Sequence, residues 1–243
     1  ALELLIEKCC DANQATKDGR TPAFIAASKG NTAALELLIE KGCDMNQAAN
    51  GGGTPVYVAA STGNTAVLEV LARAGCDVNP AAEGGRTPAH VAAMNGQTAA
   101  LELLIEKGCD LNRAANDGST PAYVAAACGN TAALKMLVKG GCDVNQVTNN
   151  GMTLAQVAAL TGQASALAAA ILEKRNDDKT KKTREKNKKK KQKKKARAAL
   201  NEGAIVESET VLRSETVAPE LLDPSPEAVE SEHPVADNDN NNQ

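Results

Sequence analysis

The stretch Thr87-Pro88-Ala89-His90-Val91-Ala92-Ala93 sets the pattern that the rest of the chain repeats. The Thr-Pro pair recurs every 33 residues, at 21–22, 54–55, 87–88 and 120–121, and the pair Thr-Leu takes the fifth place at 153–154. Cysteine followed by aspartate keeps the same period, at Cys10, Cys43, Cys76, Cys109 and Cys142. A fixed period of this size is typical of stacked repeats, in which one unit cannot bury its apolar face alone.

Each unit predicts a pair of short helices. Thr21 is a good N-cap, and Pro22 stands at the first helical position, where no backbone donor is lost. Gly30 can take a positive φ and end this helix, and Asn31 or Thr32 caps the next one. The second helix has a wide apolar stripe, which indicates burial on several sides; the stripe consists of Leu35, Leu37, Leu38 and Ile39.

The order Gly-x-Thr-Pro, Ala-Ala-x-x-Gly, an apolar helix and Gly-Cys-Asp-x-Asn resembles the ankyrin repeat. The resemblance covers residues 1–172 and implies an all-α solenoid with short β-hairpin fingers that project from the helix pairs. Residues 1–13 align with 34–46, the second half of a unit, so we expect a truncated repeat there and a fragment of a longer array. Residues 14–172 are then four full repeats and a degenerate C-terminal cap repeat.

The resemblance also implies where a partner binds. In ankyrin proteins, finger tips and inner-helix residues line a concave groove, and the corresponding positions are the ones that vary between these units. Only Arg20 and Arg86 among them belong to the residue types favoured at binding hot spots, so a generic soluble surface is the alternative. The predicted partner-binding residues are Lys17, Asp18, Arg20, Ser28, Lys29, Asn50, Gly53, Ser61, Thr62, Glu83, Arg86, Met94, Asn95, Asn116, Asp117, Ser119, Cys128, Asn149 and Met152.

The sequence offers little for catalysis, metals or cofactors. His90 shares its place in the repeat with Phe24, Tyr57, Tyr123 and Gln156, which favours a packing role over a catalytic one. No phosphate-binding glycine pattern and no Cys-x-x-Cys occurs, so we predict no enzyme activity, no cofactor and no metal. Equivalent cysteines of adjacent repeats should lie about 8–10 Å apart, too far for a disulfide, which favours reduced thiols in the cytoplasm or nucleus.

Charge is segregated in the last third of the chain. The net charge is −3, yet residues 173–197 carry 15 basic and 4 acidic residues, and residues 198–243 carry 1 basic and 11 acidic. We expect 173–200 to be a lysine-rich segment without a stable helix, because its charges repel, and 201–243 to be an acidic disordered tail. The basic positions of this segment are Lys181, Lys182, Arg184, Lys186, Lys188, Lys189, Lys190, Lys191, Lys193, Lys194, Lys195 and Arg197.

Two functions fit these features. The first is a non-catalytic scaffold that binds another protein through the concave groove. The alternative is a nuclear or nucleic-acid-associated adaptor that acts through the lysine-rich segment, with an import receptor or a weakly bound, non-specific nucleic acid as partner. An enzyme with its catalytic domain upstream of Ala1 is a third possibility. No apolar run is long enough to predict a membrane span.

Overall fold

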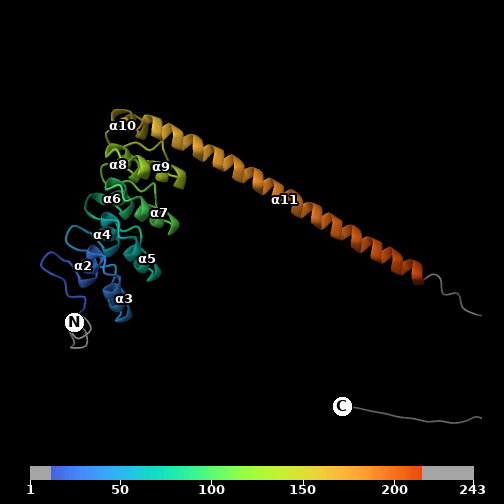
Figure 1. Cartoon of the computed structure of the whole chain (residues 1–243), viewed down its shortest axis with the longest axis horizontal. Helices are drawn as coiled ribbons and strands as arrows, with labels where there is room; N and C mark the ends of the chain where they lie inside the picture. The colour runs from blue at the N-terminus through green and yellow to red at the C-terminus, as the bar shows by residue number, and fades with distance from the viewer. Residues whose placement is uncertain (1–11, 215–243) are drawn as a thin grey trace, which may run out of the picture. The chain divides into compact units, whose positions relative to one another are not determined.

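The computed structural model describes residues 12–214, with side chains up to residue 195, and the described part is helical with tight connecting turns. Five helices form one column in Figure 1, and the helix that follows each of the first four packs beside it. The inner helices are α2 (Pro22–Lys29), α4 (Pro55–Thr62), α6 (Pro88–Met94), α8 (Pro121–Ala127) and α10 (Leu154–Leu160). The outer helices are α3 (Thr32–Glu40), α5 (Thr65–Arg73), α7 (Thr98–Glu106), α9 (Thr131–Gly140) and α11 (Ala164–Ser214).

Local capping chemistry sets the helix bounds. The Thr21 hydroxyl accepts a hydrogen bond of 3.2 Å from the Phe24 N–H, and Thr54 and Thr120 make the same bond in their repeats. Gly30 ends α2 with a φ of 73°, a left-handed conformation that glycine adopts without steric cost. The predicted caps and helix ends are therefore confirmed, and so is the ankyrin-type solenoid.

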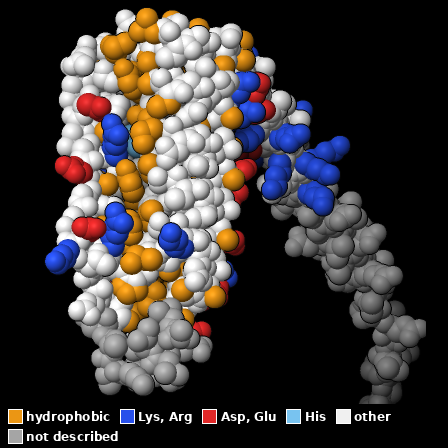
Figure 2. Space-filling model, turned by 60° about the vertical axis from the view of Figure 1, so that its left-hand side comes forward, with side chains coloured by type: hydrophobic (Ala, Val, Ile, Leu, Met, Phe, Trp, Pro, Cys, Tyr) orange, Lys and Arg blue, Asp and Glu red, His pale blue; other side chains and the backbone are white. Residues whose placement is uncertain are grey.

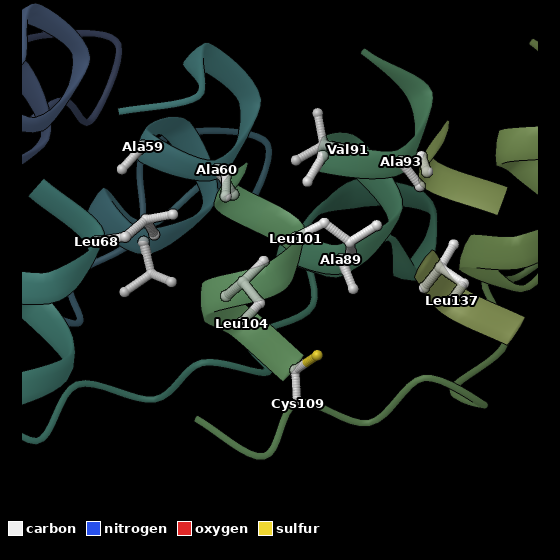
Figure 3. Close-up of a cluster of buried hydrophobic side chains, with 14 of the residues drawn as sticks. Ala59, Ala60, Leu68, Ala89, Val91, Ala93, Leu101, Leu104, Cys109 and Leu137 are labelled. Carbon is white, nitrogen blue, oxygen red and sulfur yellow. The ribbon is translucent and has the colours of Figure 1, made fainter. Parts of the chain in front are cut away.

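The core is thin and built from small side chains (Figure 3). Ala59, Ala60 and Ala93 on the inner helices are fully buried, and Leu68 and Leu101 on the outer helices pack in the same cluster. Alanine lets neighbouring inner helices approach closely, while leucine fills the space beneath them. Each repeat thus completes the core of its neighbour.

The fingers are tight turns. Each is closed by short backbone hydrogen bonds, such as the bond of 2.8 Å from Ala82 N–H to Arg86 C=O and the bond of 3.0 Å from Gly85 N–H to Ala82 C=O. The described residues contain no extended strand and a single isolated β-bridge, between Val147 and Thr153, because few residues flank each turn. A one-turn 3-10 helix, η1 (Glu83–Gly85), forms one of the finger tips.

Two hydrogen-bond ladders connect consecutive repeats. In the finger ladder, the backbone N–H of one finger donates to a carbonyl of the preceding finger, as Asn116 does to Gly84 at 2.8 Å. In the Asn–Asp ladder, an asparagine side chain accepts from the backbone N–H of the aspartate 31 residues later. Backbone polar groups that would otherwise need water are satisfied between the repeats.

The last helix differs from the sequence-based expectation. α11 has 51 residues, starts against the array with Leu167 and Ala170 buried, and continues through the lysine-rich segment. The backbone of 173–195 is helical, contrary to the expectation that this segment lacks a stable helix. The packed start supplies the nucleus that an isolated helix would have to form, and lysine, glutamate and alanine are good helix formers.

The predicted tail and the predicted truncated repeat lie largely outside the described residues. The helix α11 is assigned as far as Ser214, and the expected disorder of 201–243 stays a prediction. Residues 215–243 and 1–11 are not described, and the predictions made for them stay predictions. The chain divides into two units, 1–182 and 183–243, and the groove belongs wholly to the first.

Candidate binding groove

The predicted binding residues gather on the finger and inner-helix side of the array, which we call the groove. Figure 2 looks onto this side and shows a column of hydrophobic side chains, with Lys and Arg side chains beside it and Asp and Glu side chains along its margin. Most of the predicted residues are exposed there, as expected. Five are half-buried, namely Ser28, Gly53, Ser61, Met94 and Met152.

A hollow of about 420 Å³ lies in the middle of the groove. Its lining combines finger residues of successive repeats with the ring of Tyr57 from α4. Four predicted residues, from two fingers, meet in it: Glu83, Arg86, Asn116 and Asp117. The structure therefore brings together at one place side chains that the repeat alignment could only assign to the same surface.

Aromatic rings form the floor of the groove, which the sequence reasoning missed. The Arg20 guanidinium carbon lies 5.9 Å above the centre of the Phe24 ring, a distance suited to a cation–π contact. The Tyr123 hydroxyl lies 3.7 Å from the sulfur of Met152, which belongs to the finger of the following repeat. The shared position of these rings in the repeat was the available signal, but it was interpreted as packing alone.

Arg86 lines the central hollow together with the ring of Tyr57. Its Nη1 lies 3.8 Å from the Met94 sulfur, and its charge acts on Tyr57, whose pKa burial raises and Arg86 partly lowers again. An ion pair joins Lys139 to Glu173 at 2.8 Å, far along the chain from Arg20 and Arg86. Both groove arginines are exposed cations without a described carboxylate at salt-bridge distance.

Ser119 does not line the groove as predicted. It is 2% exposed, because its finger closes over the end of α6. Its hydroxyl and its N–H both donate to Asp117 Oδ1, at 2.5 and 2.8 Å, and these bonds lower the pKa of the Asp117 carboxyl. Ser119 is therefore not a surface residue itself, but its hydrogen bonds hold the exposed Asp117 carboxylate in place and keep it charged.

Three predicted groove asparagines have a structural task as well. Asn50 Nδ2 donates to the Lys17 carbonyl at 3.1 Å, and Asn149 Nδ2 donates to the Asn116 carbonyl at 2.8 Å. Asn95 Nδ2 donates to the Ser61 carbonyl at 2.9 Å, at the C-terminal end of the inner helices and away from the fingers. These side chains are exposed, yet their amides fix one repeat to the next.

His90 is buried and structural, as its place among aromatic residues predicted. The Thr87 N–H donates to Nδ1 at 3.1 Å, so Nδ1 is the acceptor and the proton resides on Nε2. Nε2 then donates to the Ser119 carbonyl at 3.0 Å. Burial lowers the pKa of His90, which keeps the imidazole neutral. The hydrogen bond from its Nε2 to the Ser119 carbonyl joins the third repeat to the fourth finger.

The described residues offer no further candidate for a chemical site. Four of the described cysteines are free thiols, namely Cys76, Cys109, Cys128 and Cys142. No group of histidine, cysteine and carboxylate side chains within the described ranges is arranged to hold a metal ion. None of the described helices combines the length and the apolar character needed to cross a membrane.

Comparison with known families agrees with this architecture. The family described as ankyrin repeats (3 copies) matches residues 1–82 and 79–148. The match covers more than half of the chain, and the protein belongs to the ankyrin repeat family. Proteins of this family generally act as protein–protein interaction modules and are typically non-catalytic. A comparison with curated proteins finds no match.

Proposed function

We propose that this chain is a non-catalytic scaffold that binds another protein through the groove. The observation that carries the proposal is the central hollow, where Arg86 stands beside Tyr57 and makes no salt bridge to a described carboxylate, although Glu83 and Asp117 line the same hollow. Arginine and tyrosine are the residue types that dominate binding energy at protein interfaces, and an arginine that makes no salt bridge can form charge-assisted hydrogen bonds with a partner's carboxylate.

The proposal also states that the chain is not an enzyme. The one buried histidine of the array is used in repeat packing, and its Nδ1 and Nε2 are both hydrogen-bonded to the backbone. The aspartates at the repeat junctions accept hydrogen bonds from nearby N–H groups, as Asp110 does from Asn112 at 2.9 Å. Both groups therefore have structural partners that account for their presence.

Reversal of one groove charge tests the proposal. Arg86→Glu in the full chain should abolish capture of cross-linked partners from cell extract, with an unchanged circular dichroism melt. Glu69→Arg is the matched control, because Glu69 is an exposed residue of the outer helix α5 and its charge reversal leaves the groove intact. Partners that bind both variants equally would place the binding surface elsewhere.

A second candidate function rests on the lysine-rich segment. Side chains 175–195 are all exposed, so the positive charges of this part of α11 face solvent. Such a segment would bind an import receptor, or a nucleic acid through salt-dependent, non-specific contacts, in a cytoplasmic or nuclear protein.

Two measurements test this second candidate. Retention of the full chain on a DNA or RNA column should fall steeply with salt and increase when 201–243 is deleted, because the deletion removes eleven acidic residues that would repel a nucleic acid. A fluorescent fusion of 173–200 should concentrate in the nucleus. No retention at low salt would exclude the nucleic-acid role, and an even distribution of the fusion would exclude the import role.

A further inference from the structure

We propose that the groove recognises an extended acidic segment of its partner, with an apolar side chain of that segment seated at Gly53 between Arg20 and Arg86. This inference rests on the proposed function and specifies the chemistry of the partner. We call the space above Gly53, bordered by the rings of Phe24 and Tyr57, the Gly53 notch.

Gly53 has no backbone reason to be glycine. Its φ lies outside the left-handed region, unlike the neighbouring finger glycines Gly51 and Gly52, whose φ values are 89° and 78°. A Cβ atom at this position would lie 3.6 Å from Phe24 Cε2 and 3.7 Å from Tyr57 Cδ1, which are ordinary van der Waals distances. A side chain would fit, and its absence means that position 53 covers neither of the two half-buried ring edges that face it.

The other repeats show what normally covers such rings. The equivalent finger position holds Arg20, Arg86, Ser119 and Met152. Arg20 covers the Phe24 ring in its own repeat, and Met152 covers the Tyr123 hydroxyl from the following repeat. Arg20 lies over the Phe24 ring and Arg86 lies beside Tyr57, but position 53 itself has no side chain. The ring edges that face Gly53 therefore offer an apolar surface that an inserted side chain would desolvate.

The two arginines define the charge of the segment. They flank the notch one repeat away on either side, and neither has a carboxylate at salt-bridge distance within the described part of the chain. Most of the Lys and Arg side chains on this face lie closer to the hydrophobic column than the Asp and Glu side chains do (Figure 2). A segment that follows the column therefore meets the arginines, and its carboxylates can form charge-assisted hydrogen bonds with them.

The repeat spacing defines the length of the segment. Adjacent inner helices are separated by about 8–10 Å, so the two arginines, two repeats apart, are separated by roughly 16–20 Å along the groove. An extended chain advances about 3.3 Å per residue and spans this distance in about six residues. The expected segment thus has an apolar residue in the middle and an acidic residue about three positions away on each side.

A peptide selection tests the inference with the full chain. A phage-displayed library of random 12-residue peptides is panned on the protein, and the enriched peptides are synthesised and titrated by fluorescence anisotropy. We expect them to share an apolar residue between two acidic ones. Gly53→Arg, which introduces the side chain found at positions 20 and 86, should weaken their binding at least tenfold by filling the notch.

Further variants separate the notch from the groove as a whole. Arg20→Met and Arg86→Met, which keep the aliphatic packing and remove the charge, should each weaken binding about fivefold or more, and Glu69→Arg should change it less than twofold. Peptides that lose binding to Arg86→Glu but not to Gly53→Arg would overturn the notch and leave the proposed function standing. Peptides unaffected by every groove substitution would overturn both. A selection that yields no binder, or binders without acidic residues, would overturn the inference.

Discussion

The Asn79 side-chain oxygen accepts a hydrogen bond of 2.8 Å from the backbone N–H of Asp110, in the next repeat. Asp110 in turn accepts a bond of 2.9 Å from the N–H of Asn112, whose own side chain contacts the repeat after that. The motif Gly-Cys-Asp-x-Asn therefore shapes its own turn and also attaches the following repeat. The same relationship holds for the pairs Asn13–Asp44, Asn46–Asp77 and Asn112–Asp143.

Removal of one rung of this ladder should weaken the array. Asn79→Ala leaves the Asp110 N–H without its acceptor and should lower the free energy of unfolding by about 1 kcal/mol. Asn145→Ala is the matched control, because the Asn145 side chain makes no hydrogen bond to a described residue. Urea denaturation of both variants measures the difference, and equal midpoints would show that the ladder contributes nothing to stability.

The stability of the array should depend on pH through His90. Burial, helped by the charges of Arg86 and Arg113, lowers the pKa of the folded imidazole below the value of about 6.5 expected in the unfolded chain. Between these two values the unfolded state binds more protons, so stability is complete above about pH 6.5 and is lost as pH falls toward the folded pKa.

The variant His90→Gln isolates this effect. Gln156 replaces histidine in the terminal repeat, where its side chain accepts the Thr153 N–H at 2.8 Å, so the substitution preserves the capping geometry. Thermal melts between pH 7 and 5 should show a smaller loss of stability for His90→Gln than for the natural sequence. Parallel pH profiles for the two proteins would contradict a neutral, buried His90.

A side chain at Gly96 should be poorly tolerated. Gly96 has a φ of 66°, and a Cβ atom there would lie 3.1 Å from Asn130 Oδ1. Gly96→Val should therefore cost about 1–3 kcal/mol. Gly53→Ala serves as control, because its φ is compatible with any residue, and it should leave stability unchanged or raise it by up to about 1 kcal/mol. A denaturant midpoint for Gly96→Val equal to that of the natural protein would refute the strain.

The thiols should differ strongly in reactivity. Burial raises the pKa of both Cys109 and Cys142 to about 11, whereas Cys128 is exposed. At pH 8, N-ethylmaleimide should modify Cys128 within minutes and leave Cys76, Cys109 and Cys142 unmodified until the protein unfolds. Peptide mass spectrometry of timed samples distinguishes these sites. Early modification of Cys109 would show that the array opens more easily than its packing implies.

Features that depend on one repeat alone could be predicted from the sequence. The Thr21 cap, the left-handed Gly30 and the burial of Leu35 all follow from local rules, and the structure confirms each of them. Their recurrence every 33 residues made the predictions stronger, because one pattern was seen several times. The ankyrin-type fold could therefore be predicted from the sequence alone.

Features that depend on contacts between repeats could not be predicted. The burial of Ser119 depends on the His90 ring, which lies 29 residues earlier and is specific to one repeat. The helicity of the lysine-rich segment was missed because charge repulsion was weighed without the nucleus that Leu167 supplies. The Gly53 notch likewise emerges only when two rings from adjacent repeats are placed side by side.

The Asn–Asp ladder also makes the number of repeats in this chain adjustable. Every junction uses the same donor and the same acceptor, so excision of 54–86 would bring Asn46 against Asp110 in place of Asp77. Insertion of a copy of the same 33 residues would add one rung and one layer without any new contact type. The identity of 32–44 with 98–110 shows two units already interchangeable over that stretch. The surface offered to a partner can thus be lengthened or shortened by whole units, while the chemistry that joins them stays constant.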